Sequence, residues 1–174
     1  IDLSAINYLV LNGVNKDINV IGADQSSLEV RSIAGDLLKK VKYVVSGDTL
    51  TLSGIDAGDI ETFKVTVYVP SASFKAIHVN SAEAHIKGLH TQLLNIYQNK
   101  GRVYMSDCHI ERVELGLEAA YLNMTETSVD TVSLTLEKST VNIYSPLMRL
   151  QGTLNNQSFL EHLNNVEEIQ LKKD

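Results

Sequence analysis

The stretch SFKAIHVNSAEAHIKGLHT (73–91) opens a run of four equal rows in which residue types recur every 19 positions. The rows that follow are QLLNIYQNKGRVYMSDCHI (92–110), ERVELGLEAAYLNMTETSV (111–129) and DTVSLTLEKSTVNIYSPLM (130–148). A fixed period of this length is typical of repeat architectures, in which each unit buries its apolar face against its neighbours. Helical repeats need roughly 30 residues or more, so the period excludes an α-solenoid.

Four columns of these rows are almost entirely apolar. They hold Lys75, Leu94, Val113 and Val132; Ile77, Ile96, Leu115 and Leu134; Ala84, Val103, Leu122 and Val141; and Ile86, Met105, Met124 and Ile143. Fifteen of these sixteen residues are apolar, whereas the 44% hydrophobic content of the chain predicts about seven. The columns between them are mostly polar, namely Ala76, Asn95, Glu114, Ser133 and His85, Tyr104, Asn123, Asn142. This alternation with period two indicates two strands per row, each with one side in the core.

Small residues separate the two strands of each row, in the column Ala82, Gly101, Ala120, Ser139. Small side chains suit a tight corner. The last column, Thr91, Ile110, Val129, Met148, indicates a third inward-facing segment. Three segments and three corners make one turn of a triangular coil, with successive turns about 4.8 Å apart. The sequence therefore predicts an all-β fold, a parallel β-solenoid (single-stranded β-helix) with 19-residue rungs over 73–148.

The sequence on either side of these rungs is expected to complete one domain, 1–174. Residues 149–174 keep the row length but place Gln151, Thr153, Leu160 and His162 in the four apolar columns. This predicts a polar capping rung, whose alignment with the preceding rung can be shifted by one residue. Residues 1–72 lack the period but contain strand patterns at 6–13, 17–22, 27–33 and 64–69, the last closed by Pro70. We expect a hairpin over 42–54 turning at Ser46-Gly47-Asp48, and one helical turn over 34–40.

Composition excludes several classes of function. The formal net charge of −6 argues against nucleic-acid binding, for which a basic stripe is expected. No apolar run approaches the roughly 20 residues of a membrane-spanning helix. A single cysteine, Cys108, rules out a disulfide within the chain. The first residue is Ile1 rather than Met, from which we expect that a leader has been removed.

The chain resembles the head GIN domain of putative autotransporter adhesins, a bacterial cell-envelope family with a β-helical fold. The resemblance covers nearly the whole chain: an opening strand–turn–strand (Ile6 to Val20), an SLEV strand, the DTLTLSG hairpin arm, KVTVYVP at 64–70 and then rungs of about 19 residues. Family rungs carry repeated Ser-Gly corners, whereas this chain has Ser81-Ala82, Lys100-Gly101, Ala119-Ala120 and Lys138-Ser139. The resemblance implies an exported protein of the cell surface, outer membrane or periplasm, and a lipid anchor on a removed N-terminal segment is compatible with it.

Candidate catalytic and metal-binding residues are few. Asp107 and Glu126 share one column, and Glu111 and Asp130 share another, with Arg149 beneath. Carboxylates one rung apart lie about 5 Å from each other, which is the spacing of the two carboxylates in a retaining glycosidase. Short corners provide no walls for a cleft, so we predict no enzymatic activity. His90 and His109 share a column without a nearby third ligand, so we predict no metal site. No cofactor signature is present. Cys108 is expected to be a small buried residue rather than a nucleophile.

Tyrosines provide the candidate ligand surface. Tyr97 and Tyr104 lie in outward columns, and Tyr121 and Tyr144 lie at or near corners, where sugar rings can stack on exposed aromatic rings. Asn123 and Asn142 are expected to hydrogen-bond to each other along the stack. The leading hypothesis is a non-enzymatic binding or scaffold module whose flat faces meet a glycan or a cell-surface protein. Two alternatives stay open: a polysaccharide lyase or glycoside hydrolase on a β-helix, and a purely structural spacer.

Overall fold

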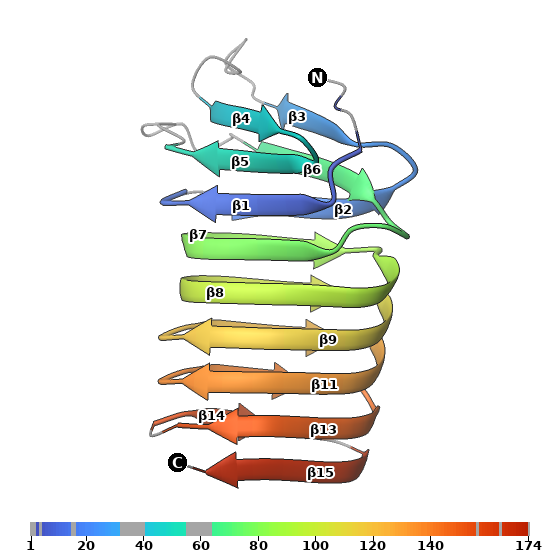
Figure 1. Ribbon diagram of the computed structural model, residues 1–174, viewed down its shortest axis with the longest axis vertical. Helices are drawn as coiled ribbons and strands as arrows, with labels where there is room; N and C mark the ends of the chain where they lie inside the picture. Colours follow the sequence, from blue (N-terminus) through green and yellow to red (C-terminus); the bar gives the residue numbers. More distant parts are fainter. Residues whose placement is uncertain are drawn as a thin grey trace.

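The chain coils into a stack of β-strands in which each turn lies against the next, as Figure 1 shows for the computed structural model. The structure describes residues 3, 5–14, 17–31, 41–54, 64–155, 157–163 and 165–173, and all regular structure in these ranges is strand. The helical turn expected at 34–40 lies outside them. No helix of the described residues is long and apolar enough to cross a membrane.

Parallel strands form the regular part of the stack. They are β7 (Ala76–Lys87), β8 (His90–Ser106), β9 (His109–Glu118), β10 (Tyr121–Thr125), β11 (Ser128–Glu137), β12 (Thr140–Ile143), β13 (Leu147–Leu154), β14 (Phe159–Glu161) and β15 (Val166–Lys173). Ile77 pairs with Ile96, Ile96 with Leu115, and Leu115 with Leu134, so each step is 19 residues. The pairing between β8 and its neighbours is interrupted at three places in each turn, near Lys100, Asp107 and Glu111. These three interruptions are the corners of the coil. The predicted solenoid, with three segments and three corners per turn, is confirmed.

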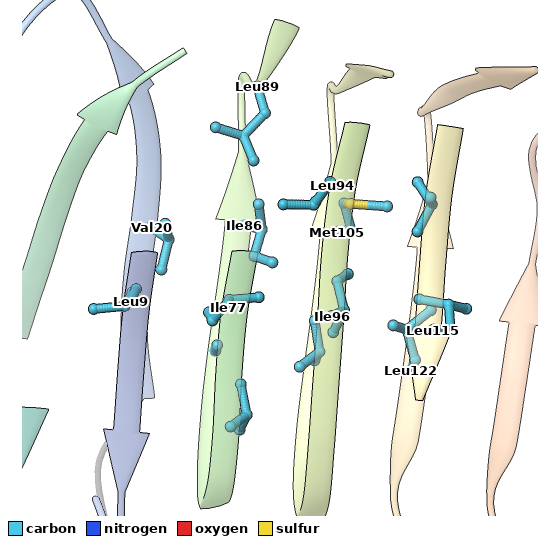
Figure 2. Packing of buried hydrophobic residues seen from close by; sticks show 14 of the residues in the cluster. Leu9, Val20, Ile77, Ile86, Leu89, Leu94, Ile96, Met105, Leu115 and Leu122 are labelled. Atoms are coloured by element: carbon cyan, nitrogen blue, oxygen red, sulfur yellow. The ribbon is translucent and has the colours of Figure 1, made fainter. Parts of the chain in front are cut away.

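The inward columns fill the interior of the coil. Figure 2 shows Ile77, Ile96 and Leu115 from one side of the coil and Ile86 and Met105 from another, packed between the two walls. All twelve residues of the columns that begin with Ile77, Ala84 and Ile86 are at most 4% exposed. Burying a side chain of this size contributes about 1.5–3 kcal/mol. The stack is therefore held by a continuous apolar core running along its axis.

Each corner between the two long segments is made by a residue with left-handed backbone followed by a small one. Ser81, Lys100, Ala119 and Lys138 have φ angles of 50°, 62°, 49° and 50°. At Gly101, which follows Lys100, a Cβ atom would lie 2.0 Å from the carbonyl oxygen of Ala82 on the preceding rung, so only glycine fits there. These are the corners that the small-residue column predicts.

Several positions depart from the expected columns. Met148 was expected to face inward but is 56% exposed, because Leu147 pairs with Val129 and takes the inward place. That step is 18 residues instead of 19, so Leu150 and Gly152, rather than Gln151 and Thr153, continue the two apolar columns into β13. Ala76, in a polar column, is buried, because its small side chain lies in the ladder between Tyr8 and Asn95.

The N-terminal part continues the same stack. Its strands are β1 (Tyr8–Asn12), β2 (Asp17–Ala23), β3 (Ser27–Arg31), β4 (Lys42–Ser46), β5 (Thr49–Ser53) and β6 (Lys64–Pro70). β1 and β2 do not form a hairpin: both pair in parallel with β7, on its two long segments. β4 and β5 form the expected antiparallel hairpin, and β6 ends at Pro70, as expected. β3 pairs antiparallel with β6, which makes this end of the stack irregular.

Candidate functional site

The four candidate tyrosines lie on two different faces of the coil. The first face consists of the outward-pointing residues of the strand segments that align with residues 76–80, and it carries Tyr97. The second face is formed by the outward residues of the segments that align with 83–87; it carries Tyr104, Tyr121 and Tyr144. The corner at Lys100 and Gly101 separates the two faces. A single surface of four tyrosines therefore does not exist.

Tyr97 is a half-exposed ring on the first face. Its side chain is 45% exposed and lies 4.7 Å from the His78 ring, centroid to centroid, with the rings tilted by 38°. A Cβ atom at Gly116, the ladder neighbour of Tyr97, would lie 3.1 Å from its Cδ1 atom. The absence of a side chain at Gly116 therefore leaves room for the ring to lie along the face.

Two open grooves meet at Tyr97 and Gly116, which line both. The larger has a volume of about 850 Å³ and extends toward the C-terminal rungs. The smaller, of about 570 Å³, extends toward β1 and contains His78. The polar groups of the larger groove are those of Glu114, Ser133, Thr135, Gln151, Thr153, Gln170 and Lys172. An exposed ring beside hydroxyl, amide and charged groups is the combination that orients a polar ligand.

The second face holds a stack of rings and amides. The rings of His85 and Tyr104 are 4.9 Å apart and nearly parallel, and Tyr121 lies 6.0 Å from Tyr104. The Tyr121 hydroxyl accepts hydrogen bonds from Nδ2 of Asn142 at 2.7 Å and of Asn123 at 3.4 Å. The expected hydrogen bond between Asn123 and Asn142 is not among the interactions of these two described residues, because both amides turn to the hydroxyl instead. Asn142 is consequently buried.

Tyr144 belongs to a separate small stack at the C-terminal end of the second face. It is 43% exposed, and its ring lies 4.6 Å from that of His162, tilted by 19°. Both side chains follow the strands β12 and β14, where the chain approaches a corner. The position near a corner matches the expectation for Tyr144.

Asp107, one of the two carboxylates of a candidate catalytic pair, is held in an ion pair. The Lys87 ammonium lies 2.7 Å from Oδ2 of Asp107, and this ion pair holds the pKa of the exposed Asp107 carboxyl below its usual range. A general acid needs the opposite shift. The expected position of Arg149 beneath Asp130 is wrong, because the 18-residue step places Arg149 beside Thr131, and its guanidinium binds Glu168.

Cys108 and the stacked histidines have structural explanations. Cys108 is 4% exposed; its thiol donates to the carbonyl of Ser106 at 3.2 Å, and burial raises its pKa. A buried thiol with a raised pKa is a poor nucleophile, as expected. The His90 and His109 rings lie a rung apart, with their centroids 6.3 Å from each other and their planes tilted by 34°.

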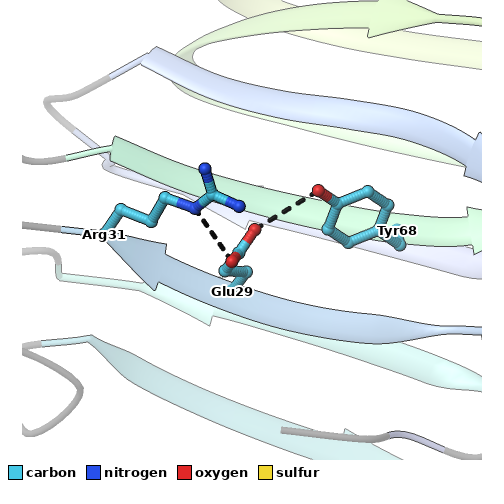
Figure 3. A network of polar contacts seen from close by, with 3 residues as sticks. All are labelled: Glu29, Arg31 and Tyr68. Atoms are coloured by element: carbon cyan, nitrogen blue, oxygen red, sulfur yellow. Dashed lines mark hydrogen bonds and ion pairs between the residues drawn. The ribbon is translucent and has the colours of Figure 1, made fainter.

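A polar network fastens the irregular end of the stack (Figure 3). Arg31 donates from Nε to Glu29 Oε1 at 2.9 Å, and the Tyr68 hydroxyl donates to Glu29 Oε2 at 3.2 Å. The guanidinium lowers the pKa of Glu29, which stays ionised. Because Tyr68 belongs to β6 and the other two residues to β3, the network joins the antiparallel pair.

The family of the chain follows from a match that spans most of it. The model of the family described as Toastrack DUF4097 matches residues 6–157. The chain belongs to the Toastrack family. The matched range begins just before β1 and ends within the turn after β13, so it includes the N-terminal strands and the regular rungs together.

Solved structures share the Toastrack fold of this chain. A putative adhesin from Parabacteroides merdae ATCC 43184 superposes with a TM-score of 0.77 at 17% sequence identity, over 99% of this chain and 75% of that one. A putative adhesin from Bacteroides fragilis NCTC 9343 gives a TM-score of 0.58 at 13% identity, over 100% of this chain and 91% of that one. At these identities the similarity establishes the fold alone. No curated protein matches the chain.

One group of potential metal ligands was missed by sequence reasoning. Asp17, Glu83 and His85 bring their ligand atoms within 4.8 Å of one another on the second face. Glu83 and His85 alternate along one strand, a signal visible in the sequence. Asp17 comes from β2 and reaches them only because β2 pairs with β7, which no local pattern of this Toastrack chain indicates.

Proposed function

We propose that this chain is a non-enzymatic, exported binding module that binds carbohydrate on the first face, with Tyr97 as the platform. The observation that carries the proposal is the half-exposed Tyr97 ring at the junction of the two grooves. A pyranose ring has an apolar C–H face that packs on an aromatic ring, and its hydroxyl groups pair with side chains around it. Ser133, Thr135 and Gln151 supply such partners in the larger groove.

The surroundings of Tyr97 favour a sugar over an apolar ligand. Nε2 of Gln151 donates to Oγ of Ser133 at 3.0 Å, so the amide carbonyl and the hydroxyl hydrogen are oriented before any ligand arrives. Glu114 is held by Arg112 at 2.9 Å, which fixes a carboxylate at the rim of the groove. Fixed polar groups beside one exposed ring select a hydroxyl-rich partner.

The relatives support a role outside the cytoplasm. Two solved structures with this fold are putative adhesins, and the resemblance to the head GIN domain implies a cell-envelope protein. We therefore propose that the chain is exported and meets its glycan at the cell surface or in the periplasm. A catalytic role is disfavoured by the open grooves, which do not enclose a substrate, and by the ion-paired Asp107.

A glycan array tests the proposal. The purified chain is expected to bind a limited set of glycans, and Tyr97→Ala is expected to weaken binding about tenfold or more, because the stacking surface is lost. Tyr97→Phe keeps the ring and is expected to retain most of the affinity.

Tyr43→Ala is the matched control, since Tyr43 is 38% exposed but lies on the edge strand β4, away from the grooves. The proposal fails if the wild-type chain binds no glycan, or if Tyr97→Ala and Tyr43→Ala bind equally well. The first result would favour the structural-spacer alternative; the second would locate the glycan elsewhere.

A further inference from the structure

Three side chains with metal-binding groups meet where β2 lies beside β7. Asp17 is the ladder neighbour of Glu83, and Asn19 is that of His85. Glu83 and His85 are two positions apart on β7, so both side chains point to the second face. One oxygen of each carboxylate and one ring nitrogen of His85 all lie within 4.8 Å of one another.

The imidazole of His85 is already oriented. Its ring stacks on Tyr104 with the centroids 4.9 Å apart and the planes at 16°. Its Nε2 atom lies 3.2 Å from Glu83 Oε1, so the nitrogen that would hold an ion faces the carboxylates. The stack on Tyr104 fixes the direction of the ring, and an ion bound between Nε2 and Glu83 would take the place of the hydrogen that now lies between them.

The charges around the group leave the two carboxylates available. Lys87, the nearest lysine along β7, is bound to Asp107 at 2.7 Å. Arg102 lines a hollow of about 280 Å³ together with Asp17 and Glu83, yet within the described part of the chain its guanidinium forms an ion pair with neither. Among the described residues, the two carboxylates thus line one hollow, and the imidazole of His85 is the ion-pair partner of Glu83.

We propose that Asp17, Glu83 and His85 bind one divalent transition-metal ion, with Zn²⁺ as the type case. Imidazole nitrogen selects Zn²⁺ and its neighbours over Ca²⁺ or Mg²⁺, which prefer sites made of oxygen alone. Three protein ligands leave a fourth position for water or for a group of a partner. Zinc bonds of about 2.0 Å place tetrahedral ligands about 3.3 Å apart, which the exposed Asp17 reaches by side-chain rotation.

Such an ion would join the irregular and the regular parts of the stack. Asp17 belongs to the N-terminal part, whereas Glu83 and His85 belong to the first 19-residue rung. Because the three ligands come together only in the folded chain, the ion binds the folded state alone and stabilises it. The inference is independent of the carbohydrate proposal, since the group lies on the second face and Tyr97 on the first.

Zinc titration of the full chain, purified without a histidine tag, tests the proposal. Calorimetry is expected to give one equivalent of bound Zn²⁺, and added Zn²⁺ is expected to raise the melting temperature. His85→Ala and Asp17→Asn are each expected to weaken binding about tenfold or more and to abolish the thermal shift. Asp17→Asn changes only one exposed carboxylate, so it serves even where His85→Ala lowers the stability of the metal-free protein.

His90→Ala is the matched control, because His90 is an exposed histidine whose ring also lies near a ring one rung away, that of His109. It is expected to bind Zn²⁺ as the wild type does. Absence of binding by the wild-type chain, unchanged binding by Asp17→Asn, or loss of binding in His90→Ala would each overturn the assignment.

Discussion

Leu115 and Glu114 are adjacent in the chain and lie on opposite sides of β9. Leu115 is 4% exposed in the core, whereas Glu114 is at the rim of the larger groove. Leu115→Asp is expected to destabilise the fold by several kcal/mol, because it buries an unpaired carboxylate in a domain whose total stability is about 5–15 kcal/mol. Glu114→Ala is expected to have little effect, since it removes only an exposed ion pair with Arg112.

Thermal denaturation followed by circular dichroism distinguishes the two variants. We expect a large drop in melting temperature, or failure to fold, for Leu115→Asp alone. Equal melting temperatures would mean that the register of β9 is wrong.

Most single-residue positions in the rungs were predictable because burial follows the period of two along a strand. The exceptions depend on neighbours that the period does not identify. Ala76 is buried by the ladder around it, and Met148 turns outward because the corner before it is one residue shorter. Asn142 is buried because a hydroxyl from the rung above accepts its hydrogen bond. Each exception depends on a neighbouring rung or on the length of a corner rather than on the strand itself.

At the scale of elements, three of the corners share one hydrogen-bonding pattern. Asp107, Glu126 and Lys138 have left-handed backbone, and the next residue donates its side-chain hydrogen to the carbonyl two positions back. These donors are Cys108, Thr127 and Ser139. Cys108 is therefore one of a set of interchangeable corner donors, which explains a buried thiol without invoking reactivity.

Ser139 has a second role, because its Oγ also accepts from the amide of Ala120 on the rung above at 3.1 Å. Ser139→Ala is expected to cost about 1–3 kcal/mol, since it leaves a buried N–H without a partner. Urea denaturation measures this loss. Ser128→Ala, at an exposed position of β11, is the control and is expected to change stability by less than about 0.5 kcal/mol. A loss for Ser139→Ala no greater than that of the control would contradict this role of the corner.

The N-terminal elements show where sequence reasoning ends. The hairpin of β4 and β5 was predictable, because its turn residues lie between two alternating strands. The stacking of β1 and β2 on β7 was not, because the paired residues Tyr8 and Ala76 lie far apart in the chain and no period connects them. The same long-range pairing brings Asp17 to Glu83, so the proposed metal site was beyond the reach of local patterns.

At the scale of the whole molecule, each rung contacts chiefly the rungs on either side. The free energy of unfolding is therefore close to a sum of contributions from single rungs and from the interfaces between adjacent rungs. Deleting residues 111–129 joins Ile110 to Asp130 and brings Ile96 onto Leu134, since both pair with Leu115 in the intact stack. The variant is expected to fold with a β-type circular dichroism spectrum and a stack shorter by about 5 Å.

Deleting residues 111–120 is the control, because it removes about half a rung and shifts every later column. Corner residues then fall beside strand residues and polar side chains point inward, so aggregation is expected. Equal behaviour of the two deletions, measured by circular dichroism and size-exclusion chromatography, would mean that the 19-residue unit is not the unit of folding.

The candidate surfaces were predictable only in part. The sequence identifies Tyr97, Tyr104, Tyr121 and Tyr144 as outward or near corners, and the structure agrees. It does not reveal that the corner at Lys100 turns Tyr97 onto a separate face, nor that Gly116 leaves space beside its ring. Grooves arise from differences in side-chain size between successive rungs, and these matter only once the rungs are aligned.

The direction of the hydrogen bonds between rungs makes the stack mechanically anisotropic. These bonds run along the long axis of the molecule, and β4 and β15, the terminal strands of the sheet order, lie toward opposite ends of it (Figure 1). A pull applied along that axis bears on the bonds of one terminal rung at a time, so the coil would peel open turn by turn at low force. A load applied across the axis is shared by the bonds of all the rungs at once, and the same molecule resists it as a stiff rod.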